Sequence, residues 1–131
     1  MGIERDFLMR QLMQLFEVIH KILGHRERGE DKQAEDQIRY FYNCLKIDTD
    51  VRKMSIEELL AFLQYEKKLS NEHIELFAFV LKEQGEMAPE ERDRVDYFRK
   101  AYFLLNKVDR ESVVYSMDRQ LKLGELKEYL N

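Results

Sequence analysis

Residues 7–23, which read FLMRQLMQLFEVIHKIL, repeat their apolar side chains with the period of an α-helix. At about 100° per residue the apolar arc spans roughly 200°, wider than the stripe of about 100° that one packing surface needs. Met9, Met13 and Phe16 extend the arc on one side. The face expected to meet water is formed by Asp6, Arg10, Gln14, Glu17 and Lys21. We therefore expect a central helix, from about Glu4 to Gly24 or Arg26, that its own domain or another chain covers on two sides.

The next two helices are predicted from an apolar stripe and from a capping pattern. Residues 31–45 place an apolar side chain every three or four positions, which predicts a second helix, and residues 46–54 follow as a loop. Ser55 and Glu58 have the spacing of a capping box, in which each side chain accepts a hydrogen bond from the other residue's backbone N–H. We expect a third helix to start there and to end within residues 65–68.

The last half of the chain predicts three further helices. Ser70 is the expected cap of a fourth helix that ends near Gly85. Pro89 fits the first position of a fifth helix, where its missing N–H costs nothing. The sixth is expected after Asp109, and the apolar residues of its predicted buried face are Val113, Val114, Met117 and Leu121. The apolar positions then shift to a different face of the helix near Gly124, so we expect a kink or a break there.

Composition supports an all-helical chain. Of the 131 residues 44% are hydrophobic and 37% charged, which is typical of a globular protein, and only 5 Gly and 1 Pro interrupt the pattern. No segment alternates like a strand. The sequence therefore predicts an all-α fold, with six helices, or seven if Gly124 breaks the last one, packed in antiparallel hairpins. Length predicts a single helical domain over residues 1–131.

Charge and cysteine content limit the expected partners and compartment. The net charge of −4 provides no positive field that would attract nucleic acid or an anionic membrane. The single cysteine, Cys44, can form no intramolecular disulfide and favours a reducing compartment. No stretch approaches the length of about 18 uncharged apolar residues that a membrane span needs, and the N-terminus lacks a secretion signal. We expect a cytoplasmic protein without a nucleic-acid or membrane partner.

Residues 71–107 resemble one tetratricopeptide repeat, a helical hairpin that stacks on its neighbours. The residues that match the family's packing positions are Ala78, Leu81, Gly85, Phe98 and Ala101. The turn is about four residues longer than the family's, and the family's tryptophan is absent. The chain is also similar to small uncharacterised helical proteins of bacteria that open with an ERDxLMRQ-like helix, here Glu4 to Gln11. The resemblance implies stacked hairpins that bind a peptide or a protein.

One motif has the spacing of a metal site. Glu17 and His20 form a Glu-x-x-His pair, which di-metal carboxylate bundles use because side chains at i and i+3 project together. His73 does not form a second Glu-x-x-His pair, because the residue three positions before it is Ser70. A metal- or ligand-binding helical bundle that uses Glu17 and His20 is therefore the alternative function.

The spare aromatic and methionine side chains predict an interface. Tyr40, Phe41 and Tyr42 are consecutive, so a helix can bury only one or two of them, and aromatic or Met side chains outside a core are typical of interfaces. No phosphate loop, triad order or zinc spacing appears, so we expect neither an enzyme nor a cofactor. The sequence predicts a protein–protein interaction module whose partner is another protein or a second copy in a homodimer. The expected contact residues are Met9, Met13, Phe16, Tyr40 and Tyr42.

Overall fold

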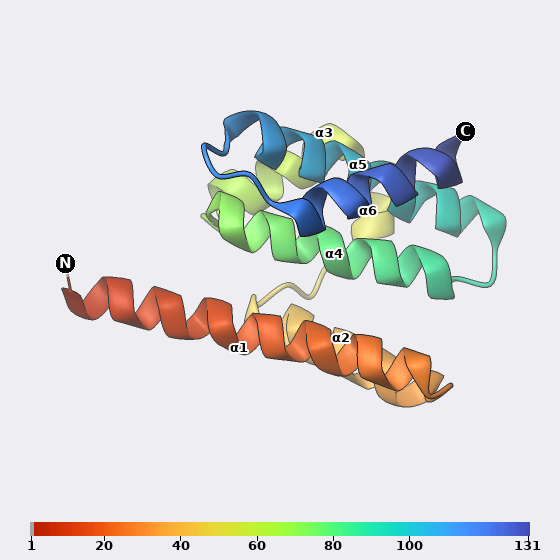
Figure 1. The fold of residues 1–131 in the computed structure, drawn as a ribbon, viewed down its shortest axis with the longest axis horizontal. Helices are drawn as coiled ribbons and strands as arrows, with labels where there is room; N and C mark the ends of the chain where they lie inside the picture. The colour runs from red at the N-terminus through yellow and green to blue at the C-terminus, as the bar shows by residue number, and fades with distance from the viewer. Residues whose placement is uncertain (1) are drawn as a thin grey trace. The chain divides into compact units, whose positions relative to one another are not determined.

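The computed structural model describes residues 2–131, with side chains from Arg5 onward, and their regular structure is entirely helical (Figure 1). The α-helices are α1 (Gly2–Glu27), α2 (Asp31–Cys44), α3 (Ile56–Ala61), α4 (Asn71–Met87), α5 (Glu91–Glu111) and α6 (Met117–Leu130). A 3-10 turn, η1 (Val51–Lys53), precedes α3, and a π-helical turn, η2 (Phe62–Glu66), extends it. The prediction of an all-α fold is confirmed, with six α-helices in residues 2–131.

The chain divides into two compact units, residues 1–49 and residues 50–131. The first unit holds α1 and α2, and the second holds α3 to α6 with both short turns. Two compact units can belong to one folding domain or to two, so the single domain over residues 1–131 stays a prediction.

The first unit is an antiparallel hairpin with helices of unequal length. Gly29 turns the chain with a φ of 75°, and the backbone N–H of Glu30 donates to the carbonyl of His25 at 2.8 Å. The Glu30 carboxylate lies 2.7 Å from His25 Nδ1 and accepts from Arg28 Nε at 2.9 Å. These hydrogen bonds, first that of His25 and then that of Arg28, hold the pKa of Glu30 below its ordinary value.

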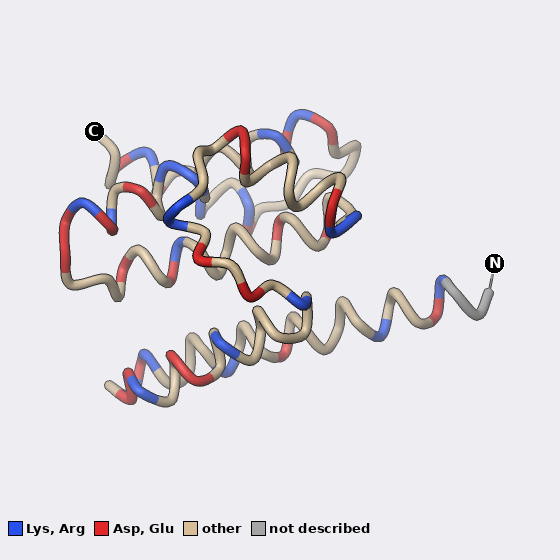
Figure 2. The backbone as a smooth tube through the Cα atoms, turned by 180° about the vertical axis from the view of Figure 1, so that it is seen from behind, with Lys and Arg blue, Asp and Glu red and all other residues tan. Residues whose placement is uncertain are grey.

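The unequal lengths leave the start of α1 without a partner helix in its own unit. α1 has 26 residues and α2 has 14, which at a rise of about 1.5 Å per residue makes them about 39 Å and about 21 Å long. Because the turn joins their adjacent ends, α1 extends beyond α2 at its N-terminal half (Figure 1). Residues 11–16 of α1, between Arg10 and Glu17, include no charged residue (Figure 2).

The buried side chains of the first unit follow narrow stripes. Those of α1 are Leu15, Val18, Ile19 and Ile22, and those of α2 and the residues after it are Ala34, Ile38, Phe41, Leu45 and Ile47. The predicted stripe of residues 31–45 is thereby confirmed. In α1, by contrast, the buried stripe spans only about 100° at about 100° per residue. Of the rest of its wide apolar arc, Leu12 and Leu23 are half-buried, and the exposed residues are Phe7, Leu8, Met9, Met13 and Phe16.

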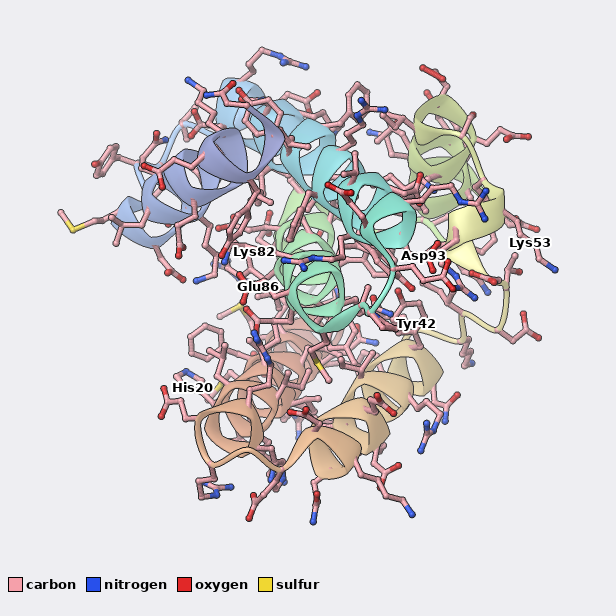
Figure 3. The ribbon with its side chains drawn as sticks, turned by 90° about the vertical axis from the view of Figure 1, so that its right-hand side faces the viewer. His20, Tyr42, Lys53, Lys82, Glu86 and Asp93 are labelled. Carbon is pink, nitrogen blue, oxygen red and sulfur yellow. The ribbon has the colours of Figure 1, made fainter. Side chains whose placement is uncertain are left out.

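The second unit is built on an antiparallel hairpin of α4 and α5, with α6 packed on α5. The helices approach closely at Gly85, where a Cβ atom would lie 2.5 Å from Cε1 of Phe98. The Phe98 ring in turn stacks on Tyr129 of α6, with ring centroids 4.5 Å apart. Within α4, Lys82 Nζ donates to Glu86 Oε2 at 2.6 Å, and Figure 3 shows these two side chains next to each other.

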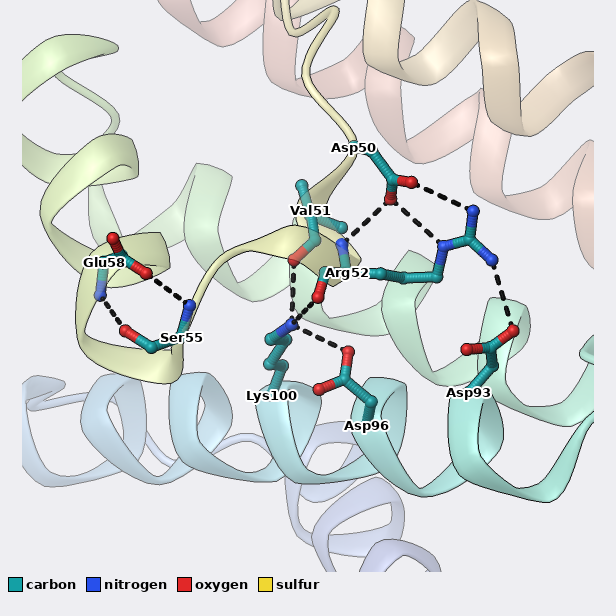
Figure 4. A network of polar contacts seen from close by, with 8 residues as sticks. All are labelled: Asp50, Val51, Arg52, Ser55, Glu58, Asp93, Asp96 and Lys100. Carbon is teal, nitrogen blue, oxygen red and sulfur yellow. Dashed lines mark hydrogen bonds and ion pairs between the residues drawn. The ribbon is translucent and has the colours of Figure 1, made fainter.

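Both predicted serine caps are confirmed. Ser55 and Glu58 form a complete capping box, with bonds of 3.0 and 2.8 Å (Figure 4), and Ser70 accepts from the backbone N–H of His73 at 3.3 Å. The third helix is not uniform, however, because its α-helical part ends at Ala61 and continues as η2. Nearby, the buried Lys100 Nζ donates to the Val51 carbonyl at 2.8 Å, which ties α5 to η1 (Figure 4).

Two predicted details at the ends of α5 are wrong. Pro89 lies before α5, which starts at Glu91 with Glu90 as its N-cap residue. α5 also continues past Asp109, because that carboxylate does not cap a helix but accepts from Arg119 Nε at 2.9 Å and Gln120 Nε2 at 2.7 Å. These hydrogen bonds, that of Arg119 first, lower the pKa of Asp109.

The sixth helix starts later than predicted and is continuous. Ser116 is its N-cap, and its side chain accepts from the backbone N–H of Arg119. Gly124 does not break α6, because the helix runs without interruption from Met117 to Leu130 and Gly124 is an exposed position within it. The kink at Gly124 stays a prediction. The apolar residues that the sequence placed on a buried face, Val113, Val114, Met117 and Leu121, are all exposed, and α6 instead buries Leu123 and Leu126.

Candidate interaction surface

Three of the five predicted contact residues lie together on the exposed side of α1. Met9, Met13 and Phe16 are 53%, 62% and 47% exposed. At about 100° per residue their stripe is centred about 140° from the buried stripe of the same helix. Each has a large apolar side chain, so this part of α1 presents to solvent the kind of surface that marks an interface.

His20 completes this stripe. Its ring meets that of Phe16 edge-on, with centroids 4.6 Å apart and an interplanar angle of 70°. Figure 3 shows His20 on the side of α1 that faces away from α2. We refer to Met9, Met13, Phe16 and His20 as the α1 outer surface. Their spacing of four, three and four residues is that of the seam positions in a coiled coil.

A stripe of alternating charges runs beside the α1 outer surface. Asp6, Arg10, Glu17 and Lys21 are all exposed and fall within about 60° of one another on the helix. In chain order their signs are negative, positive, negative and positive. Within the helix Arg10 Nε also donates to the backbone carbonyl of Asp6 at 3.4 Å. The α1 outer surface therefore has a charged border on one flank.

The two tyrosines of α2 are not part of the α1 outer surface. Tyr40 is 44% exposed, and its hydroxyl accepts a hydrogen bond from Gln14 Nε2 at 2.8 Å. Gln14 projects about 130° away from the centre of the α1 outer surface. Tyr42 is half-buried. Because it follows Tyr40 by two residues, it is rotated by about 200° from Tyr40 around the axis of α2. The predicted set of five contact residues therefore falls on different sides of the hairpin.

Glu17 and His20, the residues of the alternative metal site, are both exposed on α1. Among the side chains that the structure describes, no three His, Cys, Asp or Glu residues gather as metal ligands. The metal-binding alternative stays a prediction that elemental analysis of untagged protein tests.

A second exposed apolar region was missed by the sequence reasoning. It lies at the connection of α5 and α6, where Val113 is 101%, Val114 67% and Tyr115 71% exposed. Ser112 holds this connection, since its hydroxyl accepts from the Val114 N–H and donates to the Val114 carbonyl, each at 3.1 Å. The serines at 112 and 116, which favour caps and turns, are the signal that could have indicated a connection here.

A charged hollow of about 520 Å³ lies in the second unit between η1 and the start of α5. Its lining residues are Asp50, Arg52, Lys53, Glu90, Arg92, Asp93 and Asp96. Arg52 already bonds Asp50 Oδ2 at 3.0 Å and Asp93 Oδ2 at 3.2 Å (Figure 4). Acidic and basic groups of this hollow therefore neutralise one another, and they create no strong field of one sign.

Within residues 2–131 no helix combines the length and the apolar content that crossing a bilayer requires. Comparison of the chain with protein-family models, with curated proteins and with solved structures finds no match. The resemblance to a tetratricopeptide repeat thus stays a prediction, and the candidate site rests on the geometry of α1.

Proposed function

We propose that the chain is a non-enzymatic protein-interaction module that binds another protein chain through the α1 outer surface. The observation that carries the proposal is the overhang of α1. Its N-terminal half extends beyond α2 and exposes Met9 and Met13, together with Phe7 at 63% and Leu8 at 42%. Phe16 continues this exposed surface on the side of α1 that points away from its buried stripe. Apolar side chains gathered on one helical segment are costly in water unless another surface covers them.

The size of the effect fits a reversible interaction. Complete burial of a Met or Phe side chain contributes about 1.5–3 kcal/mol. Met9, Met13 and Phe16 are each about half exposed, so covering them contributes about 1 kcal/mol each. About 3 kcal/mol from the centre of an interface needs further contacts to give a stable complex, because association itself costs several kcal/mol. We infer a partner that also contacts the flanks of α1.

Charge and redox chemistry support a protein partner and a cytoplasmic location. A net charge of −4 favours a protein partner over a nucleic acid. The lone Cys44 favours a reducing compartment, from which we infer a cytoplasmic location.

Site-specific photo-crosslinking in cells tests the proposal. A photoreactive residue at position 13 should give covalent protein adducts, because Met13 lies in the middle of the α1 outer surface. The same residue at Tyr65, which is 77% exposed on the second unit, is the matched control and should give few. Equal labelling at both positions, or none at position 13, would contradict the proposal.

A double substitution separates binding from folding. Met9→Glu with Met13→Glu places two charges on the α1 outer surface and should abolish the adducts while the helical circular dichroism stays unchanged. If the variant instead loses its helical signal, both sides of α1 belong to the internal core and the proposal fails.

A further inference from the structure

We propose that the occupant of the α1 outer surface is α1 of a second copy of this chain, packed antiparallel to the first. This inference rests on the proposed function, because it names the partner of the same surface. The observation that carries it is the order of charges along the stripe of Asp6, Arg10, Glu17 and Lys21. In one orientation of a second copy, each of these charges lies opposite a charge of the other sign.

The charge pattern is its own complement when reversed. If two α1 helices lie antiparallel and the two-fold axis passes between residues 13 and 14, residue i of one copy lies opposite residue 27 − i of the other. Arg10 then lies opposite Glu17 of the second copy, and Asp6 lies opposite its Lys21. Two-fold symmetry repeats both pairs, so every charge of the stripe meets an opposite charge.

Symmetry also selects the antiparallel orientation over the parallel one. A two-fold axis perpendicular to both helices keeps each flank on its own side, so the two charged stripes face each other. In a parallel pair the axis runs along the helices, and the charged stripe of one copy faces the other flank of its partner. Over residues 5–23 that flank carries Leu8, Leu12, Leu23 and one charged residue, Arg5, at about 100° per residue. A parallel pair would therefore offer a complement to Asp6 at most and would leave Arg10, Glu17 and Lys21 without one.

The apolar contacts agree with this register. The seam of the α1 outer surface follows coiled-coil spacing, so its side chains can interlock with those of a second helix. Met13 lies next to the two-fold axis and meets Met13 and Phe16 of the second copy. Met9 falls between Phe16 and His20 of the second copy. The contact from Asp6 to Lys21 is about 24 Å long at 1.5 Å per residue.

Charge-reversal variants test the pairing. One variant, Asp6→Lys with Glu17→Lys, makes the stripe entirely positive, and the other, Arg10→Glu with Lys21→Glu, makes it entirely negative. Each alone should dimerise at least about tenfold more weakly than the natural chain, because like charges face each other at every pair. An equal mixture should regain dimerisation and form heterodimers. A mixture no tighter than either variant alone would overturn the antiparallel register.

Disulfide cross-linking gives an independent measure of the register. With Cys44→Ser as background, Met13→Cys places two cysteines about 1.5 Å apart along the helix axes, whereas Met9→Cys places them about 14 Å apart. Since a disulfide joins Cα atoms about 4.4–6.8 Å apart, mild oxidation should cross-link the Met13→Cys chain and not the Met9→Cys chain. Equal cross-linking of both, or of neither, would overturn the proposal.

The photo-crosslinking experiment at position 13 separates the failure of this inference from that of the proposed function. Adducts with the mass of two copies support both. Adducts only with a different protein, together with a natural chain that stays monomeric at every concentration, overturn self-pairing and leave the proposed function in place. The absence of any adduct overturns both.

Discussion

Two glycine-to-alanine substitutions in helices of the second unit should change stability in opposite directions. A Cβ atom at Gly85 would lie 2.5 Å from Cε1 and 2.7 Å from Cδ1 of Phe98. The Phe98 ring is only 3% exposed and is stacked on Tyr129, so it has little room to move. A Cβ atom at Gly124 would meet nothing within 4 Å.

The magnitudes follow from helix propensity and from overpacking. In both helices alanine is favoured over glycine by about 0.8–1 kcal/mol when nothing else changes. At Gly85 the new methyl group would approach the ring about 1 Å closer than the normal carbon contact of about 3.5–4.0 Å, and overpacking of this kind costs about 1–3 kcal/mol. We expect Gly124→Ala to gain about 1 kcal/mol and Gly85→Ala to lose about 1 kcal/mol.

Denaturant unfolding followed by far-ultraviolet circular dichroism measures this difference. The predicted gap between the two variants is about 2 kcal/mol. Adding Phe98→Leu to Gly85→Ala should recover part of the loss, which a double-mutant cycle reads as a favourable coupling. If Gly85→Ala is as stable as Gly124→Ala, then α4 and α5 do not approach as closely at this point as the structure places them.

Three further predictions concern polar groups of the second unit. Arg119 is 3% exposed and bonds both Glu75 and Asp109, so Arg119→Ala should cost about 3 kcal/mol in unfolding free energy, and Arg119→Lys should recover only part because lysine lacks the planar fork. Burial lowers the pKa of His73 from its ordinary value of 6.5. The unfolded chain therefore takes up this proton first, so stability should fall as pH drops below 6.5, and in His73→Gln the pH dependence of the unfolding free energy should be weaker. Ser55→Ala removes the capping box of α3 and should cost about 1 kcal/mol by denaturant unfolding.

Local patterns predicted the helix starts where the signal is itself local. Ser55 and Ser70 cap their helices as expected because a capping bond needs only residues three positions apart. The end of α5 was not predictable in this way. Asp109 has the right side chain for a cap, but it bonds Arg119, ten residues later in the chain. Only the packing of α6 on α5 decides which of these two uses prevails.

The candidate site was predictable only in part for a similar reason. The width of the apolar arc identified Met9, Met13 and Phe16, because that property belongs to one helix alone. The side of α1 on which α2 packs, together with the length of α2, then decides which part of the arc is covered. The packing of α2 on α1 also places Tyr40 beside Gln14. Aromatic content could indicate spare apolar surface in α2, but it could not indicate which side of the hairpin each ring would take.

Light scattering across a dilution series, with the natural chain and the Met9→Glu/Met13→Glu variant side by side, tests most directly whether the α1 outer surface joins two copies. The natural chain should approach twice its mass of 15.9 kDa as concentration rises. The variant should keep the mass of one chain with an unchanged helical signal. A natural chain and a variant of equal mass at every concentration would contradict the account.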